Sequence, residues 1–254
     1  MVNRYQFIIS YQGGKFKGSQ KQVSDHTVFN SVEQALNQLF KVTVRCIPAG
    51  RTDSRVSAAI MHFHVDLDFT FNEIKVLKRL NRSLVKVGIF IRSIQLVSSE
   101  FHALSSAKSR TYTYFFTFDS TIPHYLLDTV AYLDQDPQFI PSTEQLRSIF
   151  CGRRNFRYLS NVSDSKSTIR TIFDVHLTCN KYQTLFGESI DIFTFKITAD
   201  GFLYRMIRHI VGLLLHSMVN FTNIRYLKDY LCVHRAINYS LAPAEGLHLS
   251  GIKY

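Results

Sequence analysis

The sequence predicts an α+β fold, in which a mixed and mainly antiparallel sheet is flanked by helices. Two observations predict this class. Several segments alternate apolar and polar residues with the period of a β-strand, and others repeat apolar residues with the period of a helix. The strands come in consecutive groups rather than in strict alternation with helices, which favours antiparallel pairing. With 46% hydrophobic and 19% charged residues in 254, the chain can bury a substantial core.

The first part of the chain is predicted to contain four strands and two helices. The helices are expected at 28–39 and 72–84, and the strands at 5–11, 42–47, 61–69 and 89–97. Pro48 ends the second strand. The third strand is the clearest half-buried one, because Met61 and Phe63 alternate with His62 and His64. The two histidines therefore share its polar face, where a metal pair is conceivable, although no third ligand is indicated.

The second part continues with helix, strands and helices. A helix begins at Ser142, where Gln145 completes a capping box. Further helices are expected at 202–219 and about 223–233, and strands at 110–118, 169–179, 190–199 and 246–249. A weakly marked division near 100–107 separates an N-terminal half, 1–105, from a C-terminal half, 106–254.

Charge and composition narrow the class of partner and the compartment. Thirty lysines and arginines against 19 acidic residues give a net charge of +11, which favours a polyanionic partner such as nucleic acid. No uncharged apolar run reaches the roughly 18 residues of a membrane span. A strand pattern begins by Tyr5, so no presequence is expected. The four cysteines are too few and too scattered for a disulfide framework or a zinc site. These features favour the cytoplasm, with an organelle as the alternative.

Asp53 is the first candidate for chemistry. It follows a predicted strand, in a loop that also carries Arg51 and Arg55. Nearby positive charge favours the ionised carboxylate. A carboxylate on a loop over a rigid strand can act as a nucleophile or a base. The local sequence alone favours a turn aspartate that accepts a hydrogen bond from a backbone amide.

Five segments resemble one family in the same order along the chain. Residues 49–53 read AGRTD, similar to the G-R-T-D signature of TruA-type pseudouridine synthases. The family's other motifs are matched by YQGGKFKGSQ at 11–20, FHA at 101–103 with RTYTY at 110–114, GFLYRMIRHIVG at 201–212, and APAEGLHL at 242–249. The resemblance therefore spans nearly the whole chain.

The resemblance implies a fold, an activity and a set of site residues. The fold would be the pseudouridine synthase fold, with two similar halves around a central basic cleft. The activity would be isomerisation of uridine to pseudouridine in tRNA, by family habit in the anticodon stem-loop, with no cofactor and no metal. Asp53 matches the essential aspartate, Tyr112 the active-site tyrosine beside the target base, and Arg208 the arginine that pairs with the aspartate. Relatives are typically homodimers, so a homodimer is expected.

Further basic residues suit an RNA backbone. Arg51 is expected to bind phosphate or to orient the Asp53 loop, and Arg205 to contact RNA. Tyr114, by contrast, is expected to belong to the core face of its strand together with Phe116. The wider set of basic residues near the motifs is Lys15, Lys17, Lys21, Arg55, Arg82, Lys108, Arg110, Arg153, Arg154 and Arg157.

Three positions depart from the family pattern. Arg55 and Ser57 replace the usual glycine and histidine after the aspartate, and Ser19 replaces the usual tryptophan. Loss of the glycine removes an easy position for positive φ from the loop. The changes at Arg55 and Ser57 support the alternative of a non-catalytic tRNA-binding or folding protein on the same scaffold. A hydrolase that uses Asp53 is a third class, but it needs a metal cluster or a second catalytic carboxylate, for which no motif is present.

Overall fold

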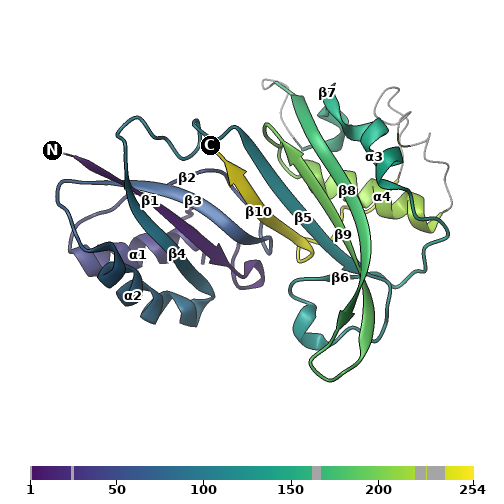
Figure 1. Ribbon diagram of the computed structural model, residues 1–254, viewed down its shortest axis with the longest axis horizontal. Helices are drawn as coiled ribbons and strands as arrows, with labels where there is room; N and C mark the ends of the chain where they lie inside the picture. The colour runs from purple at the N-terminus through teal and green to yellow at the C-terminus, as the bar shows by residue number, and fades with distance from the viewer. Residues whose placement is uncertain (1, 24–25, 162–166, 221–226, 228–237) are drawn as a thin grey trace. The chain divides into compact units, whose positions relative to one another are not determined.

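The computed structural model describes residues 2–23, 26–161, 167–220, 227 and 238–254 (Figure 1). It divides into two compact units. Unit 1 consists of Met1–Lys108 together with His248–Tyr254, and unit 2 of Ser109–Leu247. Each unit combines a mixed, mainly antiparallel sheet with helices, so the predicted α+β class is confirmed.

The sheet of unit 1 has the order β4-β1-β3-β10. Strand β1 pairs antiparallel with both of its neighbours, and β10 pairs parallel with the start of β3, where His248 lies opposite Ser57. The short strand β2 pairs with β3. The strands are β1 (Asn3–Tyr11), β2 (Ile47–Pro48), β3 (Ser57–Leu67), β4 (Ile89–Val97) and β10 (Leu247–Lys253).

Two helices complete unit 1, as predicted: α1 (Val28–Phe40) and α2 (Glu73–Leu84). Each begins at a residue whose side-chain oxygen accepts a backbone N–H three residues on, Thr27 for α1 and Asn72 for α2. Helix α1 buries an apolar stripe, and its Phe29 ring meets the Phe63 ring of β3 edge to face. Helix α2 packs on β4 and α1, and the 3₁₀ turn η2 (Val85–Val87) follows it.

The predicted strand at 42–47 is wrong except at its last residue, Ile47. The backbone amides that a neighbouring strand would have paired are bound by side chains of α1 instead. The Val44 N–H donates to Asn37 Oδ1 at 2.6 Å, and the Cys46 N–H donates to Glu33 Oε1 at 2.9 Å. This segment therefore satisfies its polar groups without joining the sheet.

The expectation that β3 is half-buried is wrong for its middle, because both faces are covered from Met61 to Val65, whereas Ala59 and Asp66 are exposed. His62 and His64 are buried, although their side chains lie on the other face of the strand from the core side chains of Met61 and Phe63. The residues that cover them come from late in unit 1. The Tyr254 ring packs 5.2 Å from that of His62, and the Ala103 N–H donates to His64 Nδ1 at 3.2 Å.

The sheet of unit 2 has the order β5-β9-β8-β7, antiparallel throughout, and the short β6 pairs parallel with β5. Its longest strand is β8, which pairs with β9 and extends four residues beyond the predicted strand at 169–179. The strands are β5 (Ser109–Thr117), β6 (Ala131–Tyr132), β7 (Gly152–Asn155), β8 (Ile169–Gln183) and β9 (Ser189–Ala199).

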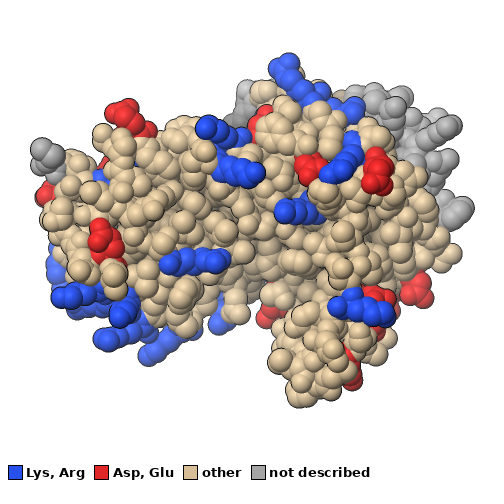
Figure 2. Space-filling view, in the orientation of Figure 1, with Lys and Arg blue, Asp and Glu red and all other residues tan. Residues whose placement is uncertain are grey.

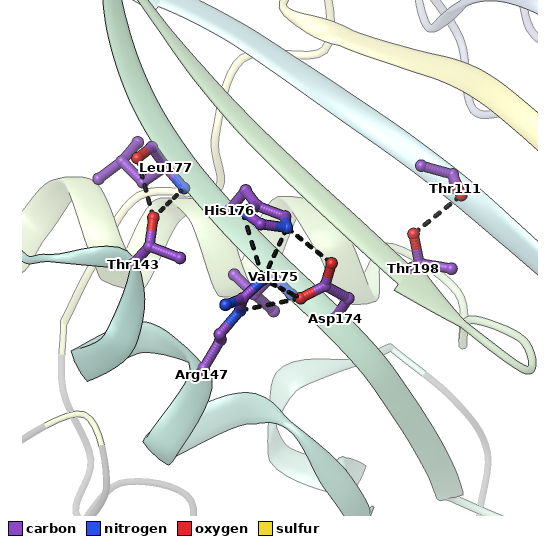
Figure 3. A network of polar contacts seen from close by, with 8 residues as sticks. All are labelled: Thr111, Thr143, Arg147, Asp174, Val175, His176, Leu177 and Thr198. Atoms are coloured by element: carbon purple, nitrogen blue, oxygen red, sulfur yellow. Dashed lines mark hydrogen bonds and ion pairs between the residues drawn. The ribbon is translucent and has the colours of Figure 1, made fainter.

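Helix α3 (Thr143–Phe150) has the predicted capping box and lies on β8. Side chains of its exposed edge fix this position (Figure 3). The Thr143 hydroxyl donates to Leu177 O and accepts from Leu177 N–H, and Arg147 forms an ion pair with Asp174, which also contacts His176.

Helix α4 (Met206–Val219) is apolar and buried on most sides, but it begins four residues later than predicted. Arg205 has φ +60°, a left-handed conformation that a right-handed helix cannot include, so residues 203–206 form a turn that leads into the helix, in which the Met206 N–H donates to Leu203 O. The helix expected at about 223–233 lies outside the described residues. Within the described part of the chain, no helix is long and apolar enough to cross a membrane.

Candidate active site

Asp53 lies in the loop between β2 and β3 of unit 1 and is partly exposed. Its carbonyl oxygen accepts the Val56 N–H at 3.2 Å, so residues 53–56 form a β-turn. Arg55 occupies the third position of that turn with φ +68°. A positive φ at this position is the signature of a type II turn, which normally carries glycine there. The loop thus retains the conformation that glycine would favour, although an arginine now occupies the position.

The segment 11–19, which lies in the motif YQGGKFKGSQ, holds this loop. Thr52 makes three bonds to it. The Thr52 N–H donates to Ser19 Oγ at 2.8 Å, the Ser19 N–H donates to Thr52 O at 3.1 Å, and the hydroxyls of Thr52 and Tyr11 lie 2.8 Å apart. Ser19 is completely buried. Because these bonds flank Asp53 directly, they fix the backbone from which its carboxylate projects.

A second attachment follows Asp53. The Gly13 N–H donates to the buried hydroxyl of Ser57 at 2.9 Å. Gly13 approaches the loop so closely that an added Cβ would lie 2.3 Å from the carbonyl carbon of Val56. Only glycine fits at this contact. The residues on both sides of Asp53 are therefore bound to one and the same neighbouring segment.

The departures at Ser19 and Ser57 acquire a structural role here. Each hydroxyl accepts a backbone N–H that holds the Asp53 loop. The local sequence alone does not indicate this role. The signal that could have indicated it is the replacement of a bulky residue by a small hydroxyl residue next to a motif, which brings a hydrogen-bond acceptor to the same place.

In unit 2, Tyr112 lies on β5, with 8% of its surface exposed. Its ring meets that of Phe202 edge to face at 5.3 Å. The next residues on the same face, Tyr114 and Phe116, are fully buried, as expected for core side chains. Burial raises the pKa of the Tyr114 hydroxyl, Glu245 raises it further, and Arg208 opposes the rise. The charges of Glu245 and Arg208 therefore both influence the ionisation of Tyr114, a side chain of β5.

Arg208 lies in the first turn of α4 and is partly exposed. Its Nε donates to Ala242 O at 2.8 Å, and the Ala242 N–H donates back to Arg208 O at 3.2 Å. Gly212 permits this approach, since an added Cβ there would lie 2.4 Å from Ser240 O. The segment continues to β5, where the Phe115 N–H donates to Gly246 O at 2.8 Å. The segment 242–246 of unit 2 thus contacts both α4, at Arg208, and β5, at Phe115.

The two remaining candidates differ in their surroundings. Arg51 is exposed on the Asp53 loop. Arg205 caps α4 in its left-handed conformation, and its guanidinium lies 4.9 Å from the ring centre of Tyr204. Among the described residues, no hydrogen-bond partner faces the buried Nε of Arg205. Arg51 and Asp53 therefore belong to unit 1, whereas Tyr112, Arg205 and Arg208 belong to unit 2.

His62 and His64 are structural. His62 Nδ1 lies 2.9 Å from the amide nitrogen of Gln6, and His64 Nδ1 accepts the Ala103 N–H. Burial, together with the positive charge of Arg4, lowers the pKa of His64 to about 4, so the ring is neutral at pH 7. Across the described residues, no group of three or more histidine, cysteine, aspartate or glutamate side chains is arranged to hold a metal ion.

Comparison with known proteins shows which family the chain belongs to. A family model described as tRNA pseudouridine synthase matches residues 148–254, the C-terminal part of the chain. Over its full length the chain is 32% identical to a tRNA pseudouridine synthase A of Maridesulfovibrio salexigens, of which it covers 91%. It is 29% identical to that of Thermodesulfovibrio yellowstonii and 28% identical to that of Bacillus sp., each covered completely. The chain belongs to the tRNA pseudouridine synthase A family.

Proposed function

We propose that the protein isomerises uridine to pseudouridine in the anticodon stem-loop of tRNA, with Asp53 as its essential catalytic carboxylate. The observation that carries this proposal is the double attachment of the Asp53 loop, before the aspartate through Ser19 and after it through Ser57. A turn residue of no further use would not need such support. Fixing a reactive carboxylate in advance is what a catalyst requires. The names of the full-length relatives support tRNA as the substrate.

The reaction detaches uracil from its ribose, rotates the base and rejoins it through carbon. It is redox-neutral and needs no cofactor. In this proposal Asp53 acts on the target sugar or base, and Tyr112 stacks near the flipped uracil, which must leave its helix before any chemistry. Arg208 pairs with Asp53 and keeps it charged, because a partly desolvated carboxylate needs a cationic partner. Arg51 and Arg205 bind the RNA backbone.

Tritium release from unmodified tRNA labelled at carbon 5 of uridine tests the proposal. Wild-type protein is expected to release tritium, and Asp53→Ala to lower the rate by at least about 10³-fold. Asp68→Ala removes an exposed aspartate elsewhere in unit 1 and is expected to react like wild type. No release by wild type, or equal release by Asp53→Ala, would contradict the assignment.

The alternative is a tRNA-binding or folding protein without catalysis, which the changes at Arg55 and Ser57 favour. It is weakened by the positive φ that Arg55 retains and by the bond that Ser57 makes. The alternative predicts that Asp53→Asn supports growth like wild type in cells that depend on this protein. Our proposal predicts loss of the modification in those cells, measured by mapping pseudouridine in their tRNA.

We further propose that the protein works as a homodimer, in line with the resemblance to its family. Light scattering at working concentration is expected to give twice the mass of one chain, 29.4 kDa. A purely monomeric protein that is fully active would contradict this.

A further inference from the structure

Helix α2 carries a stripe of positive charge. Its sequence, EIKVLKRLNRSL, contains four basic residues, and Lys86 follows in η2. At about 100° per residue, the five cations fall within an arc of about 100° along roughly 16 Å of helix. All five are exposed, and Figure 2 shows lysine and arginine side chains gathered over α2. We call this surface the α2 stripe; its members are Lys75, Lys78, Arg79, Arg82 and Lys86.

The charge of the α2 stripe is not neutralised by the fold. Within the described residues, none of the five side chains forms an ion pair. The only acidic residue of the helix is Glu73, in its first turn. Like charges three and four residues apart repel, by about 0.2–0.5 kcal/mol per pair. An ordinary solvated helix face carries both positive and negative side chains. This face carries positive side chains along its whole length despite their mutual repulsion, as expected for a surface that binds a polyanion.

The α2 stripe leads towards the Asp53 loop within unit 1. Beyond Lys86 the chain reaches Gly88, where an added Cβ would lie 2.8 Å from Lys15 Cδ. The stem of Lys15 therefore lies directly over Gly88. The Gln12 N–H also donates to Gly88 O at 3.0 Å. Lys15 belongs to the segment that holds the Asp53 loop through Gly13. Positive charge thus continues from α2 to Lys15, in the segment 11–19 that holds the Asp53 loop.

We propose that the α2 stripe is a second RNA-binding surface, which holds the sugar–phosphate backbone of the tRNA away from the nucleotide being isomerised. This inference rests on the proposed function for the identity of the RNA. A shallow depression beside the stripe, with Leu77 and Val85 among its lining residues, offers apolar contact next to the cations. Backbone contacts of this kind fix register without reading sequence.

A membrane surface is the other polyanion that a basic helix can meet. A membrane-binding helix must insert an apolar face into the lipid. In α2 that face, formed by Val76, Leu80 and Leu84, is buried within unit 1. The charged face alone is available, so the geometry favours RNA.

The test is binding of full-length unmodified tRNA transcript to a triple variant, Lys78→Gln, Arg79→Gln and Arg82→Gln. Glutamine keeps the helix propensity of the original residues. The control, Arg45→Gln, Lys181→Gln and Lys196→Gln, removes the same charge from exposed positions off the stripe. Both lower the net charge from +11 to +8, since each removes three cations.

The stripe variant is expected to bind tRNA about tenfold more weakly at physiological salt, and its salt slope to fall by about two to three. The control is expected to stay within about twofold of wild type, the difference that general charge loss produces. KM for tRNA should rise while kcat is retained. Because repulsion along α2 is relieved, Tm should not fall, which separates lost binding from misfolding. Equal affinities and salt slopes for the two variants would overturn the proposal, as would binding of wild type to anionic vesicles as tightly as to tRNA.

Failure of this inference and failure of the proposed function are distinguishable. Binding can be measured in the Asp53→Ala background, where no reaction is expected. If wild type forms no pseudouridine but the stripe variant still loses affinity for tRNA, the catalytic proposal falls and the stripe stands. If wild type is active and the stripe variant matches its control, the stripe falls and the catalytic proposal stands.

Discussion

The Asp53 loop of unit 1 and the Tyr112–Arg208 region of unit 2 are held in place by different interactions. The loop depends on a few hydrogen bonds: the hydroxyls of Ser19 and Ser57 accept backbone N–H groups, and the Thr52 hydroxyl bonds to another hydroxyl. Tyr112 is held by β-sheet pairing on β5 and by aromatic packing. Arg208 is held by reciprocal bonds between α4 and Ala242.

The difference explains where sequence change is tolerated. A hydroxyl can replace a larger side chain in the loop, provided that the backbone amide still finds an acceptor. A packed aromatic face admits few substitutes, because any change of volume leaves a cavity or a clash. Three departures from the family pattern, Ser19, Arg55 and Ser57, accordingly lie in or against the loop.

The largest loss of stability should come from substituting the glycines at which two backbone segments approach closely, Gly13 in unit 1 and Gly212 in unit 2. Gly13→Ala would bring its Cβ within 2.4 Å of three backbone atoms of residues 55–56, so we expect a loss of about 3 kcal/mol and of pseudouridine formation. Gly212→Ala clashes with Ser240 O, but alanine gains about 1 kcal/mol as a helix residue. Urea unfolding with parallel activity assays should therefore rank Gly13→Ala as the more damaging. The reverse order would contradict the comparison.

Lowering the pH should destabilise unit 1 through its buried histidine, His64. The pKa of His64 is lowered from 6.5 to about 4. Between these values the unfolded chain binds a proton that the folded chain does not, so stability falls as pH falls. The contribution of the neutral His64 ring to the free energy of unfolding is fully present above pH 6.5, and up to about 3 kcal/mol of it is lost by pH 4.

The measurement is urea unfolding across that pH range. His64→Asn is the control, because its amide oxygen can accept the Ala103 N–H without titrating. The variant should lack this part of the pH dependence. An unchanged slope would show that His64 is not its source.

Two buried serines provide a matched pair for the next effect. Ser57→Ala leaves the Gly13 N–H without its acceptor and should cost about 2 kcal/mol. Ser217 of α4 is equally buried, but its hydroxyl donates to Leu213 O, a carbonyl within the helix. Ser217→Ala should be neutral or slightly stabilising, since alanine favours the helix and no amide is orphaned. Equal losses of Tm in the two variants would sink the distinction between the regions.

The smallest effect concerns two arginines with positive φ, Arg55 in unit 1 and Arg205 in unit 2. The left-handed conformation costs an ordinary residue about 1 kcal/mol or more, and asparagine tolerates it better. Arg55→Asn and Arg205→Asn should each raise stability by up to about 1 kcal/mol while raising KM for tRNA. Chemical denaturation and kinetics on the same samples check both. A gain in stability with unchanged KM would show that these arginines do not bind RNA.

The alternating patterns predicted most strands and helices, because periodicity reflects which face each element buries. They failed where distant side chains decide the outcome. The segment 42–46 has strand-like residues, yet Asn37 and Glu33 of α1 bind its amides. His62 and His64 look like a polar face, yet residues 101–103 and Tyr254 cover them. No local pattern contains those partners.

The candidate site shows the same limit. The quoted motifs singled out Asp53, Tyr112 and Arg208, because a family signature records which residues are needed. It does not record what holds them. The bonds of Ser19 and Ser57 depend on how the segment 11–19 folds against the loop, and that is tertiary information.

Strand β10 has a consequence for biosynthesis. It pairs with the first residues of β3, directly after the Asp53 loop, yet it is made only after all of unit 2. While the ribosome is still translating residues 109–247, unit 1 has an open sheet edge beside its candidate catalyst. A nascent chain should therefore complete the scaffold of its candidate site only once residues 247–253 have emerged, after the whole of residues 109–246 has been made.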